Sequence, residues 1–400
     1  MSVVAVAMMV MNVVTYGFNL VAARMLVPAE FGALTALLSL ILMANVVALA
    51  LQAAIARRIS VAPQHTLSII HTASRVSLAL ALAVGAAGAA TTVVLTPAFD
   101  FSSMWSVIFC GAMIVPLTLT GALMGVAQGT ARWKRLSVLF VGNGFGRLLG
   151  GVGGLLVDAS ATSAMAGLAI GAWLPVLLGA GLLKSDADED PHSRRPLVFE
   201  TVTSAATLLA YFAFSNVDAL VARGGFEPHD SGLYASGLIL TKSTLFLPQF
   251  VSVVFFPSLA RDSSHRTRLR AAGLVAVLGL AVVAGTALLP DLALILVGGE
   301  QYEEIAGDLW LFAVSGTFLA IVYLLVFDAL ARREGGVAIL VWVAAAIVFA
   351  VAYFNRIDIV GLVTTMAVTS AVLAAVLLVW PLLKASPAPA DLEVSEPASD

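Results

Sequence analysis

Long apolar stretches separated by short polar segments make up almost the whole of this 400-residue chain. A membrane helix needs about 20 mostly apolar residues, because it must cross roughly 30 Å of hydrocarbon at 1.5 Å per residue. We therefore predict an all-α polytopic membrane protein with about twelve transmembrane helices. The expected spans are 3–23, 32–55, 72–95, 103–127, 136–157, 162–183, 199–222, 232–259, 269–290, 305–330, 337–354 and 359–383.

The composition agrees with this pattern. Hydrophobic residues make up 60% of the chain and charged residues 11%, and the mean hydropathy is +1.01. Soluble domains carry about 25% charged residues, so the composition excludes a soluble globular protein. A transmembrane β-barrel would show short alternating strands, which are not found. The first apolar stretch directly follows Met1 and is longer than the core of a signal peptide, so we interpret it as the first membrane helix. The single cysteine, Cys110, allows no disulfide framework.

The distribution of Lys and Arg predicts the orientation. We number each loop by the span that it follows. Even loops and the tail hold sixteen cations, and odd loops hold three: Arg24, Arg223 and Arg356. Positive loops stay in the cytoplasm. The even loops and both termini are therefore expected there, and the chain is expected in the plasma or inner membrane. The sixteen are Arg57, Arg58, Arg75, Arg132, Lys134, Arg135, Lys184, Arg194, Arg195, Arg261, Arg266, Arg268, Arg270, Arg332, Arg333 and Lys384.

The chain also repeats itself at an offset of close to 200 residues. The segment NLVAARMLVPAEFG at 19–32 has its counterpart in NVDALVARGGFEPHDSG at 216–232. Repeats of six spans keep the same orientation, so an axis along the membrane normal should relate them. Four parts are expected: a six-helix lobe at 1–183, a cytoplasmic linker at 184–198, a second six-helix lobe at 199–384 and a disordered tail at 385–400. The tail is rich in Pro, Ser and acids, which is typical of disorder.

Two cations lie inside predicted spans. Arg147 stands about ten residues from either end of the fifth span, among seven glycines, and Lys242 lies about ten residues into the eighth. Charges at membrane depth are costly and commonly mark a substrate pathway. The structural alternative is a buried cation held by a neighbouring Asn or a backbone carbonyl. No acid lies near mid-depth in any span, so these groups favour an anion, and an Arg fork suits phosphate.

Five further residues are candidates with open alternatives. Asp218, near the outer end of the seventh span, either pairs with Arg223 or lines the mouth of a cavity. Arg24 and Arg223 stand at the outer rim, where simple interfacial anchors are equally common. Asn19 and Asn216 could bind a sugar or hold helices together.

No catalytic or cofactor motif is present. The sequence contains no HExxH, P-loop, GxSxG or His/Cys ligand cluster, and all five histidines lie in loops. No loop is long enough for a catalytic domain. An enzyme, such as a saccharide polymerase, is therefore disfavoured, and neither a cofactor nor a nucleic-acid partner is expected. A coupling ion such as Na⁺ or H⁺ would leave no readable motif.

Several segments resemble the polysaccharide-biosynthesis flippases, Wzx-like proteins of the multidrug/oligosaccharidyl-lipid/polysaccharide exporter superfamily. The segment ARMLVPAEFGALTALLSL at 23–40 is similar to their first hairpin, although Val27 replaces the usual Gly. The others are GALMGVAQGTARWKRLSVLFVGNGFGRLLGGVGGLLV at 121–157, SNVDALVA at 215–222, SGLYASGLILTKSTLFLPQFVSVVFFPSLAR at 231–261 and LILVGGEQYEEIAGDLWLFAVS at 294–315. Together they cover nearly the whole chain.

The resemblance implies a MATE-like architecture of two lobes around a cationic cavity. It implies that a polyprenyl-pyrophosphate-linked saccharide is flipped from the inner to the outer leaflet, with membrane lipids and polysaccharide-synthesis proteins as partners. Arg147, Lys242, Arg24 and Arg223 would hold the pyrophosphate. The alternative is a cation-coupled multidrug exporter of the same fold. That function needs a buried acid, for which Asp218 is the candidate in the seventh span.

Overall fold

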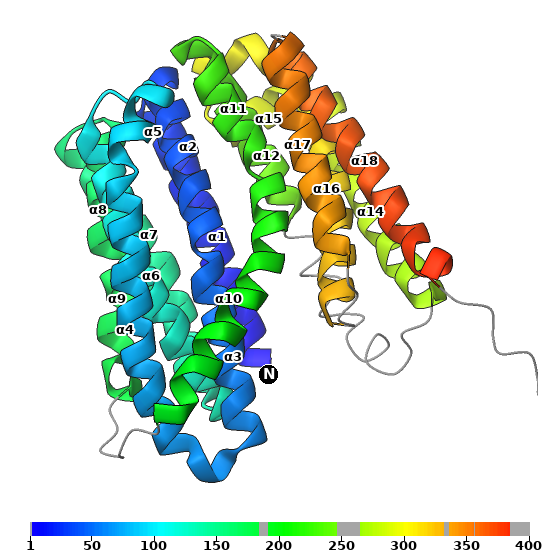
Figure 1. Ribbon diagram of the computed structural model, residues 1–400. Coiled ribbons are helices and arrows are strands. Elements are labelled where there is room, and N and C mark those ends of the chain that lie inside the picture. Colours follow the sequence, from blue (N-terminus) through cyan, green and yellow to red (C-terminus); the bar gives the residue numbers. More distant parts are fainter. Residues whose placement is uncertain (1, 184–190, 246–264, 332–335, 356, 385–400) are drawn as a thin grey trace, which may run out of the picture.

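The computed structural model describes residues 2–183, 191–245, 265–331, 336–355 and 357–384, and this part of the chain is helical without strands (Figure 1). The predicted tail, the first part of the predicted linker and the second half of the eighth span lie outside the described residues. Helices of the first half are α1 (Ser2–Met25), α2 (Pro28–Ala44), α3 (Val46–Val61), η1 (Pro63–His65), α4 (Thr66–Ala90), α5 (Thr92–Ala98), α6 (Met104–Gly129), α7 (Trp133–Val157), α8 (Ala161–Gly171), α9 (Trp173–Gly179) and η2 (Ala180–Leu183). Those of the second half are α10 (Pro191–Phe214), α11 (Val217–Gly225), α12 (Pro228–Thr244), α14 (His265–Leu288), α15 (Pro290–Val297), η3 (Glu300–Asp308), α16 (Leu309–Ala331), α17 (Val337–Asn355) and α18 (Ile359–Lys384).

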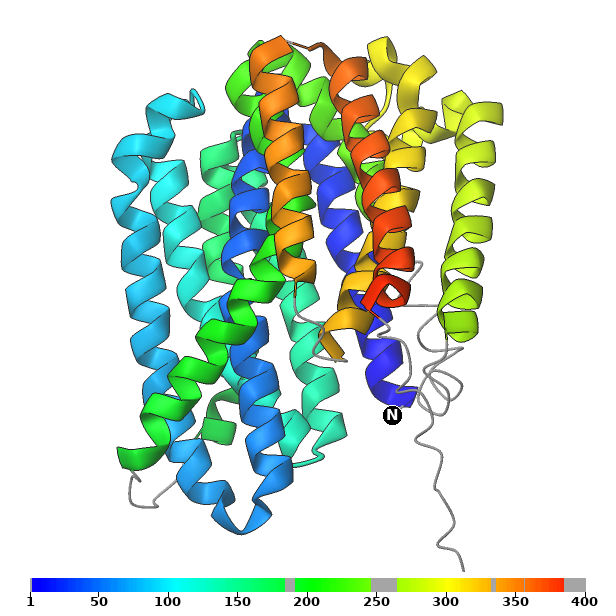
Figure 2. The ribbon, with the colours of Figure 1, turned by 45° about the vertical axis from the view of Figure 1, so that its right-hand side comes forward.

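The helices form two bundles that stand side by side (Figures 1 and 2). We call α1 to η2 the first lobe and α11 to α18 the second lobe. Ten helical stretches within the described residues are long and apolar enough to cross a membrane, and they match ten of the twelve predicted spans. The predicted seventh span is interrupted at Ser215 and Asn216, between α10 and α11, and the eighth continues from α12 beyond the described residues.

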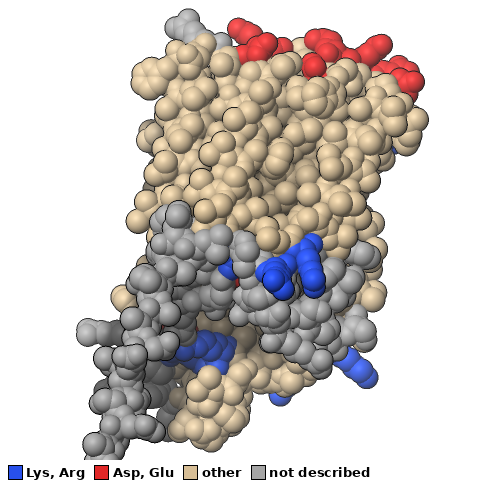
Figure 3. Space-filling model, turned by 90° about the vertical axis from the view of Figure 1, so that its right-hand side faces the viewer, with Lys and Arg blue, Asp and Glu red and all other residues tan. Residues whose placement is uncertain are grey.

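Charge distinguishes the two ends of the molecule. Figure 3 shows Asp and Glu gathered at one end of the surface, with Lys and Arg lower down. We call the end where α2 and α12 begin the acidic end, because Glu30 and Asp230 lie in their first turns. We call the opposite end, where α3 finishes with Arg57 and Arg58, the basic end. This separation matches the alternation of charged loops in the sequence.

The two repeated hairpins start their second helices in the same way. Val27 and Glu227 are the N-cap residues and have similar backbone angles, φ −65° and ψ 154° for Val27 and φ −55° and ψ 149° for Glu227. Each is followed by a proline at the first helical position, Pro28 or Pro228. A proline suits that position, because its missing N–H has no helical partner there. The two helices, α2 and α12, then pack against each other across the lobes.

Gly232 lets these two helices touch. A Cβ atom at Gly232 would lie 2.6 Å from Pro28 Cα and closer still to the Pro28 carbonyl group. At Gly32, a Cβ atom would lie 2.6 Å from Ser231 Oγ and 2.9 Å from Gly232 N. The backbones of the two lobes are therefore in direct contact at the acidic end.

Two hydrophobic cores show where the lobes meet. The larger core crosses between them at the acidic end, where Phe18, Leu26 and Phe31 of the first lobe share it with Tyr234 and Tyr302 of the second. The smaller core fills the basic half of the first lobe and contains no described residue of the second lobe. Apart from α10, the described lobes are thus joined at the acidic end.

Helix α10 belongs to both lobes. Leu197, near its start, is buried in the smaller core of the first lobe. Tyr211, near its end, stacks edge-on against Tyr323 of α16 with ring centroids 5.4 Å apart. The sequence predicted a linker at 184–198 and a second lobe from residue 199. The helix α10, which includes residues 191–198, extends diagonally from one lobe to the other (Figure 2) and contacts both α3 and α17.

Candidate functional site

A cavity of about 150 Å³ lies inside the first lobe, among α1, α2, α3, α6, α7 and α8. Its walls are mostly apolar. Its polar lining residues are Asn45, Gln52, Thr120, Asn143 and Arg147. No described acidic residue lines it.

Arg147 is the one charged residue among those that line this cavity. Its Nε atom is buried and has no hydrogen-bond partner within the described residues. The same holds for Thr120 Oγ1 on the opposing helix α6. A buried polar group without a partner costs about 1–3 kcal/mol, and more when it is charged. Because both residues line the cavity, a polar ligand or water that reached these atoms would remove that cost.

The other polar side chains of the cavity are only partly satisfied. Asn143 Nδ2 lies 3.6 Å from Met11 Sδ, a weak acceptor. Gln52 Nε2 donates to Gln128 Oε1 over 3.0 Å. The cavity therefore combines one cation, the Arg147 guanidinium group, with amide and hydroxyl groups that can donate hydrogen bonds. This combination suits an anionic ligand.

Glycines position Arg147 by bringing α7 against α8. A Cβ atom at Gly167 would lie 2.9 Å from Gly154 N and closer still to Gly150 O, and a Cβ atom at Gly171 would lie 2.8 Å from the Gly146 carbonyl carbon. Small residues allow such close approach of membrane helices. The glycines of α7 and α8 therefore allow the two helix backbones to lie in contact beside Arg147.

Lys242 lies on α12 and does not line this cavity. Its ammonium group donates to Ser215 O and, over 3.0 Å, to Asn216 Oδ1. The break between α10 and α11 leaves the Ser215 carbonyl without a helical partner, so the lysine satisfies an orphan backbone acceptor. Asn216 in turn donates to Phe212 O over 2.8 Å. This arrangement matches the structural alternative given for Lys242.

Asp218 is buried beside this group. Its carboxylate accepts from Ala219 N at 2.9 Å and from Tyr234 OH at 3.1 Å. It therefore does not pair with Arg223, which was one of the two alternatives. The buried acid Asp218 therefore has the cation Lys242 as an electrostatic neighbour, whereas no described acid lines the cavity of Arg147.

Arg223 and Arg24 hold segments together at the acidic end. Arg223, on α11, donates to the carbonyl oxygens of Asp100, of Phe99 at 3.0 Å and of Ala29 at 3.3 Å, all in the first lobe. Burial lowers the pKa of Arg223, and the nearby acids Asp100 and Glu30 raise it. Arg24, on α1, donates to Ile295 O in the second lobe at 2.9 Å.

Additional bonds join the lobes at this end. Tyr302 OH donates to Ala23 O at 3.0 Å, and Gln301 Nε2 donates to the same oxygen and to Leu26 O. Asn19 is half-buried on α1 and makes no side-chain hydrogen bond within the described residues. The role of Gln301 at the lobe contact was not predicted from the sequence.

The structure thus separates the candidate residues into three places. Arg147 lies in the cavity of the first lobe. Lys242, Asn216 and Asp218 share one cluster in the second lobe, and Arg24 and Arg223 lie at the contact between the lobes. Thr120 was missed by sequence reasoning. A threonine in an apolar helix usually bonds to its own preceding turn, so it carries no distinct signal.

No protein-family model and no curated protein matches the chain. Its fold is similar to that of an inward-facing multidrug resistance MATE family transporter of the MOP superfamily, with a TM-score of 0.74, 14% identity and coverage of 94% of both chains. An outward-facing conformation of such a transporter gives a TM-score of 0.64, 16% identity and coverage of 96% of this chain and 94% of that chain. Lipid II flippase MurJ in its inward closed conformation gives a TM-score of 0.73 and 10% identity, with coverage of 96% of this chain and 88% of that chain. The chain therefore has a MATE-like fold.

Proposed function

We propose that this protein is a transporter that flips an anionic polyprenyl-pyrophosphate-linked saccharide across the membrane by alternating access, for cell-surface polysaccharide synthesis. The observation that carries the proposal is the uncompensated Arg147 in the cavity of the first lobe. A cation in a low-dielectric pocket without an acid attracts an anion strongly. A guanidinium group suits the planar geometry of phosphate oxygens.

The cavity can accommodate a small charged group. Its volume of about 150 Å³ is well above the roughly 10–15 Å³ that one water molecule needs by the same kind of measure, so a phosphate group fits beside Arg147. We therefore assign the charged group of the substrate to Arg147, with the lipid chain in the bilayer.

The conformation fits loading from the basic end. The shared core and the bonds of Arg24 and Arg223 close the acidic end. The fold is also more similar to an inward-facing MATE transporter (TM-score 0.74) than to an outward-facing one (0.64). Basic loops favour the cytoplasm, so we propose that the basic end faces inward and that the substrate enters there.

The remaining candidates take supporting roles in this proposal. Lys242 stabilises the helix break of the second lobe, with Asn216 as its partner. When the acidic end opens, Arg24 and Arg223 lose their hydrogen bonds to carbonyl oxygens of the other lobe. Their guanidinium groups then bind the departing pyrophosphate. Asp218, on which a cation-coupled drug exporter would depend, is instead bonded to Ala219 N and Tyr234 OH.

Flipping of a fluorescent polyprenyl-pyrophosphate-linked saccharide in proteoliposomes tests the proposal. Arg147→Gln removes the cation and is expected to slow flipping at least tenfold at equal reconstitution, and Arg147→Lys should retain part of the rate. Arg135→Gln is the matched control, because Arg135 is an exposed arginine near the start of the same helix. Equal rates for Arg147→Gln and Arg135→Gln would remove Arg147 from the site.

A further inference from the structure

The break between α10 and α11 gathers oxygen atoms around a cation. The Ser215 carbonyl and Asn216 Oδ1 both accept from the Lys242 ammonium group, the latter over 3.0 Å. The buried carboxylate of Asp218 adds an electrostatic interaction with the same ammonium group. Carbonyl oxygens at broken membrane helices are typical ligands of Na⁺, and the C-terminal end of a helix such as α10 favours a cation. The oxygen atoms at this break are therefore of the kind that bind a small cation.

Asn216 is oriented by bonds that do not involve Lys242. Its Nδ2 atom donates to Phe212 O at 2.8 Å and to Ser215 Oγ at 3.0 Å. These bonds use both N–H donors of the amide, so turning the amide round would break both of them. The end of α10 thus directs Oδ1 toward the ammonium group, and Oδ1 would keep this direction without the lysine.

Asp218 is likewise held by neutral groups. Its carboxylate accepts from Ala219 N at 2.9 Å and from Tyr234 OH at 3.1 Å. An ionised carboxylate in the interior of a membrane protein is costly unless a cation lies near it. Lys242 supplies that charge in the wild type. Loss of the ammonium group would leave the carboxylate in need of another cation or of a proton.

We propose that the oxygens of this cluster, Ser215 O, Asn216 Oδ1 and the Asp218 carboxylate, form a binding site for one monovalent cation. In the wild type, the Lys242 ammonium group occupies the site as a tethered substitute for a free ion. Na⁺ or K⁺ therefore binds there only when the ammonium group is absent. This inference concerns the second lobe and does not rest on the proposed transport of a saccharide.

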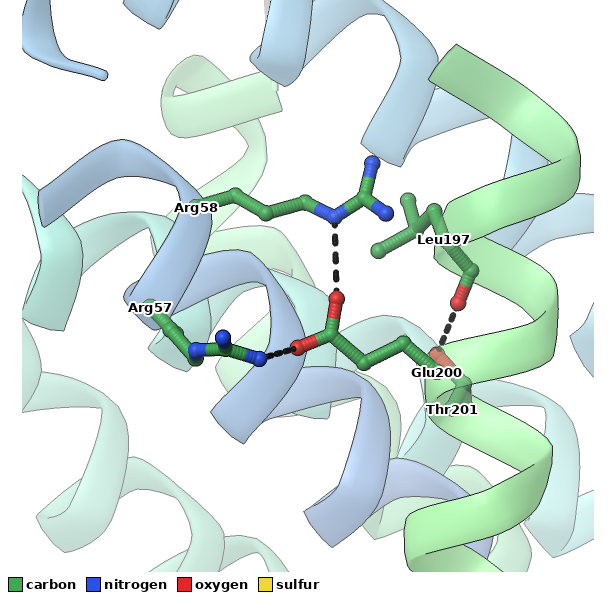
Figure 4. Close-up of polar contacts among 5 residues, drawn as sticks. All are labelled: Arg57, Arg58, Leu197, Glu200 and Thr201. Atoms are coloured by element: carbon green, nitrogen blue, oxygen red, sulfur yellow. Dashed lines mark hydrogen bonds and ion pairs between the residues drawn. The ribbon is translucent and has the colours of Figure 1, made fainter. Parts of the chain in front are cut away.

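The tethered cation also attaches α10 to the second lobe. At the basic end, Glu200 of α10 accepts from Arg57 at 2.6 Å and from Arg58 at 3.2 Å, as Figure 4 shows. At the opposite end of α10, the ammonium group of α12 donates to Ser215 O. A lysine in the cation site thus joins the helix that crosses between the lobes to α12. A free ion would satisfy the same oxygens without this connection.

Thermal unfolding of the purified full chain in detergent tests the site. The chain is measured in NaCl, KCl or choline chloride at about 150 mM each, which keeps electrostatic screening equal. Lys242→Ala removes the ammonium group and keeps the oxygen atoms. We expect NaCl or KCl to raise the unfolding temperature of this variant by at least about 3 °C over choline chloride, because an ion that binds only the folded state stabilises it.

Three comparisons make this result specific. The wild type and Lys134→Ala, which removes an exposed lysine of α7, should each unfold at the same temperature in all three salts. Lys242→Ala/Asp218→Asn should lose the response, because the neutral side chain no longer attracts an ion. Lys242→Ser adds a hydroxyl group beside the same oxygens and should respond as Lys242→Ala does, so it serves as the second variant if Lys242→Ala does not fold.

Equal unfolding temperatures of Lys242→Ala and Lys242→Ser in the three salts overturn the proposal, since Asp218 would then take up a proton in place of an ion. Failure of both variants to fold in NaCl and in KCl also overturns it, because a free ion should replace the ammonium group. A response in the wild type or in Lys134→Ala, or one that persists in Lys242→Ala/Asp218→Asn, overturns it as well.

Discussion

Replacing Gly232 with alanine would place a methyl group inside the backbone of the first lobe. The added Cβ would lie 2.6 Å from Pro28 Cα and closer to the Pro28 carbonyl group. Carbon atoms in contact are normally 3.5–4.0 Å apart, so α2 and α12 would have to separate by about 1 Å or more. Overpacking of this kind costs about 1–3 kcal/mol. This cost arises only in the conformation in which the two lobes touch at the acidic end.

The variant should therefore shift the balance of conformations. A penalty of about 1–3 kcal/mol corresponds to a change of roughly 5–150-fold in the ratio of acidic-end-closed to acidic-end-open molecules. Spin labels at Ala159 and Glu303, one exposed on each lobe, would report the separation of the lobes by pulsed electron resonance. The native Cys110 is buried and would be replaced by serine.

Gly225→Ala is the matched control. Gly225 lies at the same end, and a Cβ atom there would meet nothing within 4 Å. We expect a long-distance population to grow in Gly232→Ala and to stay at the wild-type level in Gly225→Ala. If a folded Gly232→Ala protein kept the wild-type distance distribution, the contact of α2 with α12 would not control the closed acidic end.

Three further predictions follow from single contacts. Lys242→Met leaves the Ser215 carbonyl and Asn216 without their charged donor. The stability measured by thermal unfolding in detergent should therefore fall by about 1.5–3 kcal/mol. Unchanged stability with lost transport would instead make Lys242 a substrate ligand. Arg223→Gln removes charged bonds to three carbonyls of the first lobe and should increase the open population in the spin-label experiment; an unchanged population would exclude Arg223 from the closure. Gly167→Ala should destabilise the first lobe by about 1–3 kcal/mol, whereas Gly153→Ala, with open space around it, should not; equal unfolding temperatures would contradict the packing of α7 on α8.

Much of the architecture is readable from the sequence because the membrane imposes it. The length of each apolar stretch predicts a membrane span. The alternation of basic and non-basic loops predicts which loops lie together at the same end of the molecule. The Pro28 and Pro228 hairpins are visible because proline at a helix start and glycine one turn later are local signals. Arg147 is visible for the same reason, since a cation in the middle of an apolar span is rare.

Contacts between distant segments are not readable in this way. The role of Lys242 depends on a helix break at Ser215 and Asn216, where no proline or glycine indicates an interruption. The pairing of Glu200 with Arg57 joins residues 143 positions apart, and it requires α10 to cross between lobes. The position of one lobe relative to the other sets these contacts, and local pattern carries no information on it.

Transport by the wild-type protein of two substrates of opposite charge tests the central claim most directly. Proteoliposomes would be given a fluorescent polyprenyl-pyrophosphate-linked saccharide in one arm and a fluorescent cationic drug in the other. We predict flipping of the anionic lipid-linked saccharide, with a rate that falls in Arg147→Gln, and no movement of the drug. Drug transport that is abolished by Asp218→Asn, without flipping of the saccharide, would contradict the account.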